Sequence, residues 1–168
     1  MKSEKKFPLF VISDCSNVFD QDILKILLQK EKPYLILNGN EFCNIYSNPK
    51  FYRQAWLAHC CDLAEQSERP VAFCAAIKPD MLESFGNCGF GEIYWLAIVG
   101  DEKTVLNRLR QAHVTNQDWI KSALLSVAWL KENAVSAYPQ MTCLDMTELS
   151  AEDAADFVDQ WICERINP

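Results

Sequence analysis

A short polar turn near the amino terminus carries the residue types of this chain that could do chemistry. Its seven residues are Ser13, Asp14, Cys15, Ser16, Asn17, Val18 and Phe19. Before it, residues 7–12 are apolar throughout, which is typical of a parallel strand covered on both faces. From Asp20 onwards, apolar residues recur at helical spacing. Because the backbone N–H groups at a helix start carry partial positive charge, a strand, turn and helix in this order form a candidate anion-binding loop.

The side chains with which such a loop binds phosphate are missing. The usual pattern is G-x-x-x-x-G-K-S/T, because glycines let the backbone fold around the anion, the lysine reaches the outer phosphates and the hydroxyl binds the metal ion. Here Ile12 and Asn17 stand at the two glycine positions. Val18 stands for the lysine and Phe19 for the hydroxyl residue, while Asp14 would repel a polyphosphate at close range. We therefore expect a turn too closed for a polyphosphate, with Val18 or Phe19 packed into the space that phosphate would fill.

Five short apolar segments are predicted to be the strands that position this turn. They are residues 7–12, 34–37, 71–77, 92–99 and 141–144. The segments between them favour helices that begin near Asp20, Pro49, Asp101, Asn116 and Ser150, with a further short helix near Pro79. Strands that alternate with helices in this way predict a three-layer α/β/α domain. A length of 168 residues suits a single domain over residues 1–168.

The helix predicted to begin at Pro49 contributes two further candidates. Its predicted inward face consists of Tyr52, Ala55, Trp56, His59, Cys60 and Leu63. We interpret His59 as a structural histidine within this face rather than as a catalytic base. Arg53 lies on the same helix and is a candidate for substrate binding.

The charge of the chain restricts its partners. The formal net charge is −7, and no basic run occurs beyond Lys2, Lys5 and Lys6. Nucleic acids and anionic membranes both favour clustered Lys and Arg, so we expect neither as a partner. The sequence has neither the apolar core of a signal peptide nor a run of about 20 apolar residues, so a cytoplasmic location is expected. The expected partner is then an unidentified small molecule or protein.

The eight cysteines give little sign of a metal centre or of a disulfide framework. They stand at positions 15, 43, 60, 61, 74, 88, 143 and 163, and none forms a C-x-x-C pair. On a helix, the side chains of His59, Cys60 and Cys61 point about 100° apart in succession, so they cannot bind one ion together and no metal is expected. Cytosolic thiols stay reduced. Cys15 is the candidate for a thiol-based enzyme or redox sensor, because a helix start can lower the pKa of a thiol.

Four longer segments resemble one known family in their sequence, order and spacing. They are LNGNEF (37–42), ERPVAFCAAIKP (68–79), IYWLAIVGDEKTVLNRLR (93–110) and CLDMTELSAEDAADFVDQWI (143–162). The family is that of the small P-loop kinases, which phosphorylate nucleosides, nucleotides and other small metabolites. The resemblance covers nearly the whole chain and implies a five-stranded parallel sheet in the order 2-3-1-4-5 with helices on both faces.

The same resemblance implies a set of site residues. It places phosphate binding in residues 12–19, substrate or metal chemistry at Asn40 and Glu41, and lid cations at Arg108 and Arg110. The family has an aspartate at the position of Asn40, whose amide can neither accept a substrate proton nor neutralise a metal ion. The third predicted strand also ends in two alanines, with no acid to hold magnesium through water.

Three functional hypotheses follow from these residues. The leading one is a nucleoside- or nucleotide-kinase-like protein that has lost ATP binding and phosphotransfer, uses no cofactor and binds a small ligand or a partner. The alternative is an active ATP-dependent small-molecule kinase with a divergent phosphate loop, which would require ATP and magnesium. The third is a thiol-based enzyme that uses Cys15. Because phosphoryl transfer depends on positioning and charge stabilisation, the joint loss of lysine, hydroxyl and acid favours the first.

Overall fold

The computed structural model of the chain describes residues 6–14, 18–39, 49–82 and 89–166. In chain order its elements are β1 (Leu9–Ser13), α1 (Asp20–Leu27), β2 (Leu35–Asn38), α2 (Pro49–Ser67), β3 (Val71–Ala75), a short 3₁₀ helix (Pro79–Met81), β4 (Ile93–Val99), α3 (Glu102–Gln111), α4 (Gln117–Asn133), β5 (Thr142–Asp145) and α5 (Ala151–Ile166). Every predicted strand is present, with boundaries that differ from the predicted ones by a residue or two.

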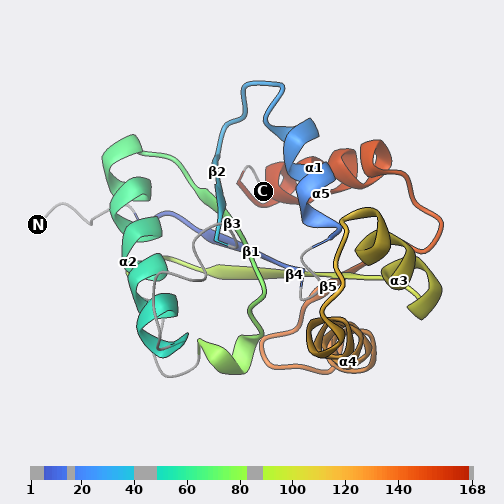
Figure 1. The fold of residues 1–168 in the computed structure, drawn as a ribbon. Helices are drawn as coiled ribbons and strands as arrows, with labels where there is room; N and C mark the ends of the chain where they lie inside the picture. Colours follow the sequence, from blue (N-terminus) through green and yellow to red (C-terminus); the bar gives the residue numbers. More distant parts are fainter. Residues whose placement is uncertain (1–5, 15–17, 40–48, 83–88, 167–168) are drawn as a thin grey trace, which may run out of the picture.

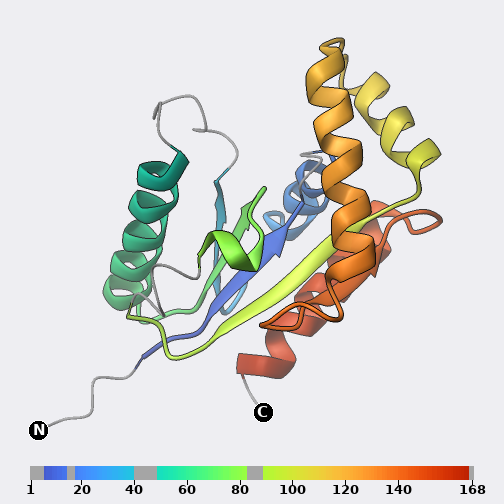
Figure 2. The ribbon, with the colours of Figure 1, turned by 90° about the horizontal axis from the view of Figure 1, so that it is seen from below.

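The five strands form one parallel sheet in the order β2-β3-β1-β4-β5, which confirms the expected topology. β1 lies at the centre, and its last residue, Ser13, pairs with Ala75 of β3 and Ala97 of β4. Figure 2 shows β1 and β4 running side by side through the middle of the molecule. Because all strands are parallel, the turn that follows β1 opens at the same edge of the sheet as the ends of β3 and β4.

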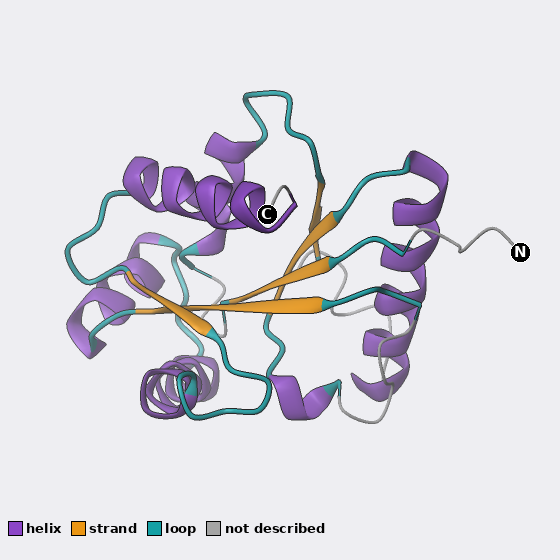
Figure 3. Cartoon of the chain, turned by 180° about the vertical axis from the view of Figure 1, so that it is seen from behind, coloured by secondary structure: helices purple, strands orange, loops and turns teal. Residues whose placement is uncertain are grey.

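Helices cover both faces of the sheet and give the three expected layers. α1 and α5 pack together on one face, and α2 and α4 lie on the other, against β3 and β4 (Figure 1). α3 sits at one end beside α4. The view from behind shows the same layers, with α2 at the β2 side of the sheet and α4 at the β5 side (Figure 3).

The core is built on the strands whose two faces are both covered. All residues of β1 and β3 are buried, as their unbroken apolar sequences predict for central parallel strands. Phe10 of β1 stacks on Tyr94 at 5.3 Å between ring centroids and meets the ring of Trp161 edge to face at 5.4 Å. These contacts fix the central strand against β4 and α5.

The inward face predicted for α2 is right in part: Cys60 is buried and Trp56 packs on Phe73 of β3 at 5.4 Å between ring centroids, but Ala55 and His59 are exposed. The buried side chains are Leu57, Cys60 and Ala64, whereas His59 is exposed and touches the edge of the Trp56 ring at 5.7 Å between centroids. These three buried residues belong to the hydrophobic core, and the partly buried Trp56 packs against it. His59 is therefore a surface residue and not the core histidine that the sequence pattern predicts.

Three predicted helix starts are capped as expected. Asp101 Oδ1 accepts a hydrogen bond of 2.7 Å from the backbone N–H of Thr104 at the start of α3. Asn116 Oδ1 accepts bonds of 2.9 and 3.0 Å from two backbone N–H groups of α4. Ser150 Oγ accepts a bond of 3.1 Å from the backbone N–H of Asp153 in α5. Such caps satisfy donors that a helix leaves unpaired at its amino end.

One acidic residue ties α5 to the segment between α1 and β2. Asp159 accepts hydrogen bonds from Lys32 Nζ at 2.6 Å and from Tyr34 OH at 2.7 Å, and all three residues are at least partly buried. Burial raises the pKa of the Asp159 carboxyl, but the two hydrogen bonds and the charge of Lys32 outweigh it, so this pKa lies below its ordinary value. The ionised carboxylate is thus favoured by the folded state.

Replacing Asp159 by asparagine should lower the free energy of unfolding by about 1–2 kcal/mol at pH 7, because a partly buried charged hydrogen bond is lost. The depressed pKa of Asp159 stabilises the fold above the carboxyl's unfolded pKa, and this contribution disappears as the pH falls through the folded pKa. Urea unfolding of both proteins from pH 7 to pH 3 measures the difference, which should shrink below about pH 4. The exposed Asp156→Asn of the same helix is the control; a difference that stayed constant down to pH 3 would contradict the assignment.

Candidate functional site

The turn after β1 is held by one carboxylate oxygen. Asp14 follows β1 directly and is wholly buried. Its Oδ2 accepts hydrogen bonds from three successive backbone N–H groups, those of Val18 at 3.0 Å, Phe19 at 2.7 Å and Asp20 at 3.0 Å. The N-cap residue of α1 is Phe19, whose side chain cannot accept a hydrogen bond. A carboxylate from outside the helix therefore takes the place of a local cap.

Two apolar side chains complete this junction. Val18 is 8% exposed and Phe19 is 1% exposed. A Cβ added to Gly100 would come within 2.9 Å of the Phe19 ring, so this ring lies against the backbone that leaves β4. Both side chains are thus packed in the interior. That the turn excludes a polyphosphate stays a prediction.

Ser13, the residue before Asp14, links β1 to the segment that follows β3. Its hydroxyl donates a hydrogen bond of 2.6 Å to the backbone oxygen of Ile77, just after β3. Ser13 is wholly buried. The bond joins the ends of the two central strands, so this serine has a structural role that the sequence analysis did not anticipate.

One of the two predicted lid cations reaches α1. Arg108, in the last turn of α3, donates from Nη1 to Asp22 Oδ2 at 2.8 Å. Asp22 belongs to the first turn of α1, and Lys25 also lies 3.6 Å from it. Arg110 is exposed, and its nearest described contact is a long one of 3.4 Å to the side chain of Asn107. The structure therefore brings Arg108, but not Arg110, to the start of α1.

Of the remaining predicted site residues, the structure describes Arg53. Arg53 is half-buried in α2, which packs on β3. Cys15, Ser16, Asn17, Asn40 and Glu41 lie outside the described residues. Their proposed roles stay predictions.

A further group at the carboxyl edge of the sheet was missed by the sequence analysis. Thr147 Oγ1 accepts a hydrogen bond from the backbone N–H of Asp101 at 2.9 Å and donates one to Asp145 Oδ1 at 2.6 Å. Lys131 Nζ lies 3.5 Å from the same carboxylate of Asp145. These residues line an open hollow of about 440 Å³ with Glu148. Its only sequence signal is that polar residues follow β4 and β5 at the edge where parallel sheets bind ligands.

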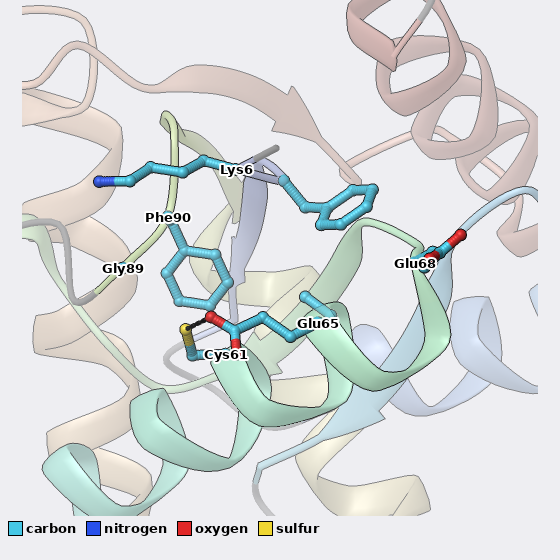
Figure 4. A pocket seen from close by; sticks show the side chains of 8 residues that line it. Lys6, Cys61, Glu65, Glu68, Gly89 and Phe90 are labelled. Atoms are coloured by element: carbon cyan, nitrogen blue, oxygen red, sulfur yellow. Dashed lines mark hydrogen bonds between the residues drawn. The ribbon is translucent and has the colours of Figure 1, made fainter. Parts of the chain in front are cut away.

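A second hollow, of about 560 Å³, lies at the opposite, amino edge of the sheet (Figure 4). Phe90 and Glu65 both line it, and Cys61 Sγ donates to Glu65 Oε1 at 3.7 Å. Two of its lining residues, Lys6 and Gly89, adjoin segments outside the described residues.

Other classes of site find little support among the described residues. Within residues 6–14, 18–39, 49–82 and 89–166, no group of three or more His, Cys, Asp or Glu side chains is placed to hold a metal ion. The five cysteines in these ranges are thiols rather than disulfides. No helix there has both the length and the apolar character that crossing a membrane requires.

Replacing Asp14 by alanine should lower the free energy of unfolding by about 3 kcal/mol, because three buried N–H groups lose a charged acceptor. Asp14→Asn keeps an acceptor without its charge and should cost about half as much. The matched control is Asn116→Ala, which removes an exposed cap from α4 and should cost about 1 kcal/mol. Urea unfolding at pH 7 measures all three. A loss for Asp14→Ala no greater than for Asn116→Ala would show that the Asp14 bonds contribute little.

Comparison with known proteins assigns the fold. No protein-family model and no curated protein matches the sequence. The tunicamycin resistance protein of Deinococcus radiodurans superposes with a TM-score of 0.64 at 12% identity, over 94% of this chain and 96% of that one. A gluconokinase from Sinorhizobium meliloti gives 0.55 at 13% identity, over 95% and 97% of the two chains. A sugar kinase from Janibacter gives 0.55 at 13% identity, over 95% of each. At these identities the likeness concerns the fold alone, and by that measure the chain has the fold of a P-loop kinase.

Proposed function

We propose that this chain is a nucleoside- or nucleotide-kinase-like protein that no longer binds ATP or transfers phosphate, and that it acts as a domain for binding a small ligand or a partner. One observation carries the proposal. Asp14 Oδ2, buried inside the protein, already takes the three N–H groups at the start of α1. These are the donors that a phosphate loop offers to its nucleotide.

Electrostatics explains why this carboxylate disfavours a nucleotide. A phosphate bound at the same amides would place negative charge within a few ångströms of Asp14. At 4 Å two like unit charges repel by about 4 kcal/mol for an effective dielectric constant of about 20. The nucleotide would also have to replace hydrogen bonds that are already made. Both effects lower its affinity.

The side chains around the turn add to this argument. Val18 and Phe19 are buried apolar groups at the positions of the lysine and of the metal-binding hydroxyl. Asn40 stands where the family has an acid. Removing one charge-stabilising donor typically costs about 3 kcal/mol, or roughly a hundredfold or more in rate. Such losses are not additive, but phosphoryl transfer depends almost entirely on groups of this kind.

A binding role fits what remains of the architecture. The core of β1 and β3 is continuous, and hollows with mixed polar and apolar linings lie at both edges of the sheet. The gluconokinase and the sugar kinase among the similar structures act, by their names, on small molecules. On that basis we propose that this chain also binds a small molecule.

Calorimetric titration with ATP and magnesium, together with a phosphate-release assay on candidate nucleosides, tests the proposal. The wild-type protein should show neither micromolar binding nor turnover. Val18→Lys should not restore either, because its ammonium would meet a loop without glycines and with Asp14 in place. Val18→Leu is the matched control for folding, checked by circular dichroism. Tight binding or clear turnover by the wild type would establish the alternative of an active kinase with a divergent phosphate loop.

A further inference from the structure

Two hollows meet at Lys131, in the last turn of α4. The first is the hollow of about 440 Å³ at the carboxyl edge of the sheet, where Asp145 and Thr147 follow β4 and β5. The second, of about 280 Å³, lies between the start of α3 and α4. Asp101 and Lys131 line both hollows, which we therefore name together the Lys131 groove. None of the described residues of α1, or of the turn before it, lines this groove.

The first hollow offers charges of both signs. Lys131 Nζ lies 3.5 Å from Asp145 Oδ2, and about half of each side chain is exposed. Such an exposed ion pair contributes little to stability, so it can open for a ligand. The other oxygen, Asp145 Oδ1, accepts hydrogen bonds from the backbone N–H of Thr147 at 2.9 Å and from its hydroxyl at 2.6 Å, which hold the carboxylate in place. A cation beside a fixed carboxylate suits a zwitterion, because each charged group of the ligand then meets the opposite sign.

The second hollow adds an apolar wall. Among its lining residues, Val105 and Val127 are buried, Leu124 is half-buried and Ala128 is exposed. A volume of about 280 Å³ accommodates an aliphatic side chain of a few carbons. Such a side chain gains by leaving water for an apolar surface. The groove therefore combines a polar part for a charged head group with an apolar part for a short tail.

We propose that the Lys131 groove binds a free α-amino acid with an aliphatic side chain. The ligand's carboxylate pairs with Lys131, its ammonium pairs with Asp145, and its side chain enters the second hollow. The inference rests on the proposed function and deepens it, because it names a class for the small ligand. Asp101 and Glu148 also line the first hollow, so acids outnumber the lysine there and the ammonium is the stronger anchor.

The experiment is a titration of the isotope-labelled full chain with L-leucine, followed by the NMR shifts of the backbone amides. We expect a dissociation constant of about a millimolar, with the shifts confined to the groove. Three analogues each lack one group. Glycine, without the side chain, should bind at least about tenfold more weakly than leucine. 4-Methylpentanoate, without the ammonium, should bind about fivefold more weakly, and isopentylamine, without the carboxylate, about threefold more weakly.

Variants assign each contact to its residue. Lys131→Gln should weaken leucine binding about threefold without weakening isopentylamine binding, because the amine has no carboxylate for the lysine to meet. Asp145→Asn should weaken the binding of both ligands about fivefold. Ala128→Phe puts a ring at the wall of the second hollow and should weaken leucine binding at least about tenfold. The controls Lys121→Gln and Asp118→Asn remove exposed charges elsewhere on α4 and should match the wild type.

The outcomes are distinguishable. The proposal is overturned if leucine causes no shift at concentrations far above a millimolar, or if Lys131→Gln and Ala128→Phe bind it as the wild type does. Equal binding of leucine and its three analogues overturns it as well. ATP with magnesium, added to the same protein, separates the two levels of inference. Tight ATP binding refutes the proposed function, however leucine behaves, whereas a protein that responds to neither ATP nor leucine refutes only the amino-acid site.

Discussion

One carboxylate oxygen joins the central strand of this protein to its first helix. Asp14 Oδ2 lies where β1 ends and α1 begins, and it satisfies backbone donors that the apolar residues of the turn cannot satisfy. Burying a carboxylate costs several kcal/mol, which only a set of good hydrogen bonds can offset. The position of α1, and through it the packing of α5 and the approach of Arg108, depends on this arrangement. The junction thus needs an anion, and the chain supplies it.

The parts of the fold that local sequence determines were predictable. β1 and β3 are wholly apolar runs, so their burial at the centre of a parallel sheet follows from the pattern alone. Asp101 and Asn116 precede amphipathic segments and cap them as expected. The order of the strands could not be predicted in this way, because composition and periodicity do not determine it. It came from the resemblance to P-loop kinases, and the observed sheet has that order.

The parts that depend on tertiary packing were not predictable from a pattern. The inward face of α2 is turned towards Leu57 and Ala64 relative to the predicted one, so His59 lies outside it. Asp22 and Arg108 lie 86 residues apart in the sequence, so only the tertiary fold makes them partners. For Asp14 the sequence indicated repulsion of phosphate, but not hydrogen bonds from backbone N–H groups four to six residues further along the chain.

The contact between Phe19 and the backbone at Gly100 makes the core intolerant of a small residue at position 19. The ring fills the space beside β4, and it is almost fully buried. Exchanging a buried phenylalanine for a residue the size of alanine or serine leaves a cavity and typically costs about 3–5 kcal/mol. That is a large part of the roughly 5–15 kcal/mol that stabilises an ordinary domain. A lineage that carries this ring could therefore acquire a serine or threonine at position 19 only after other substitutions had refilled the space.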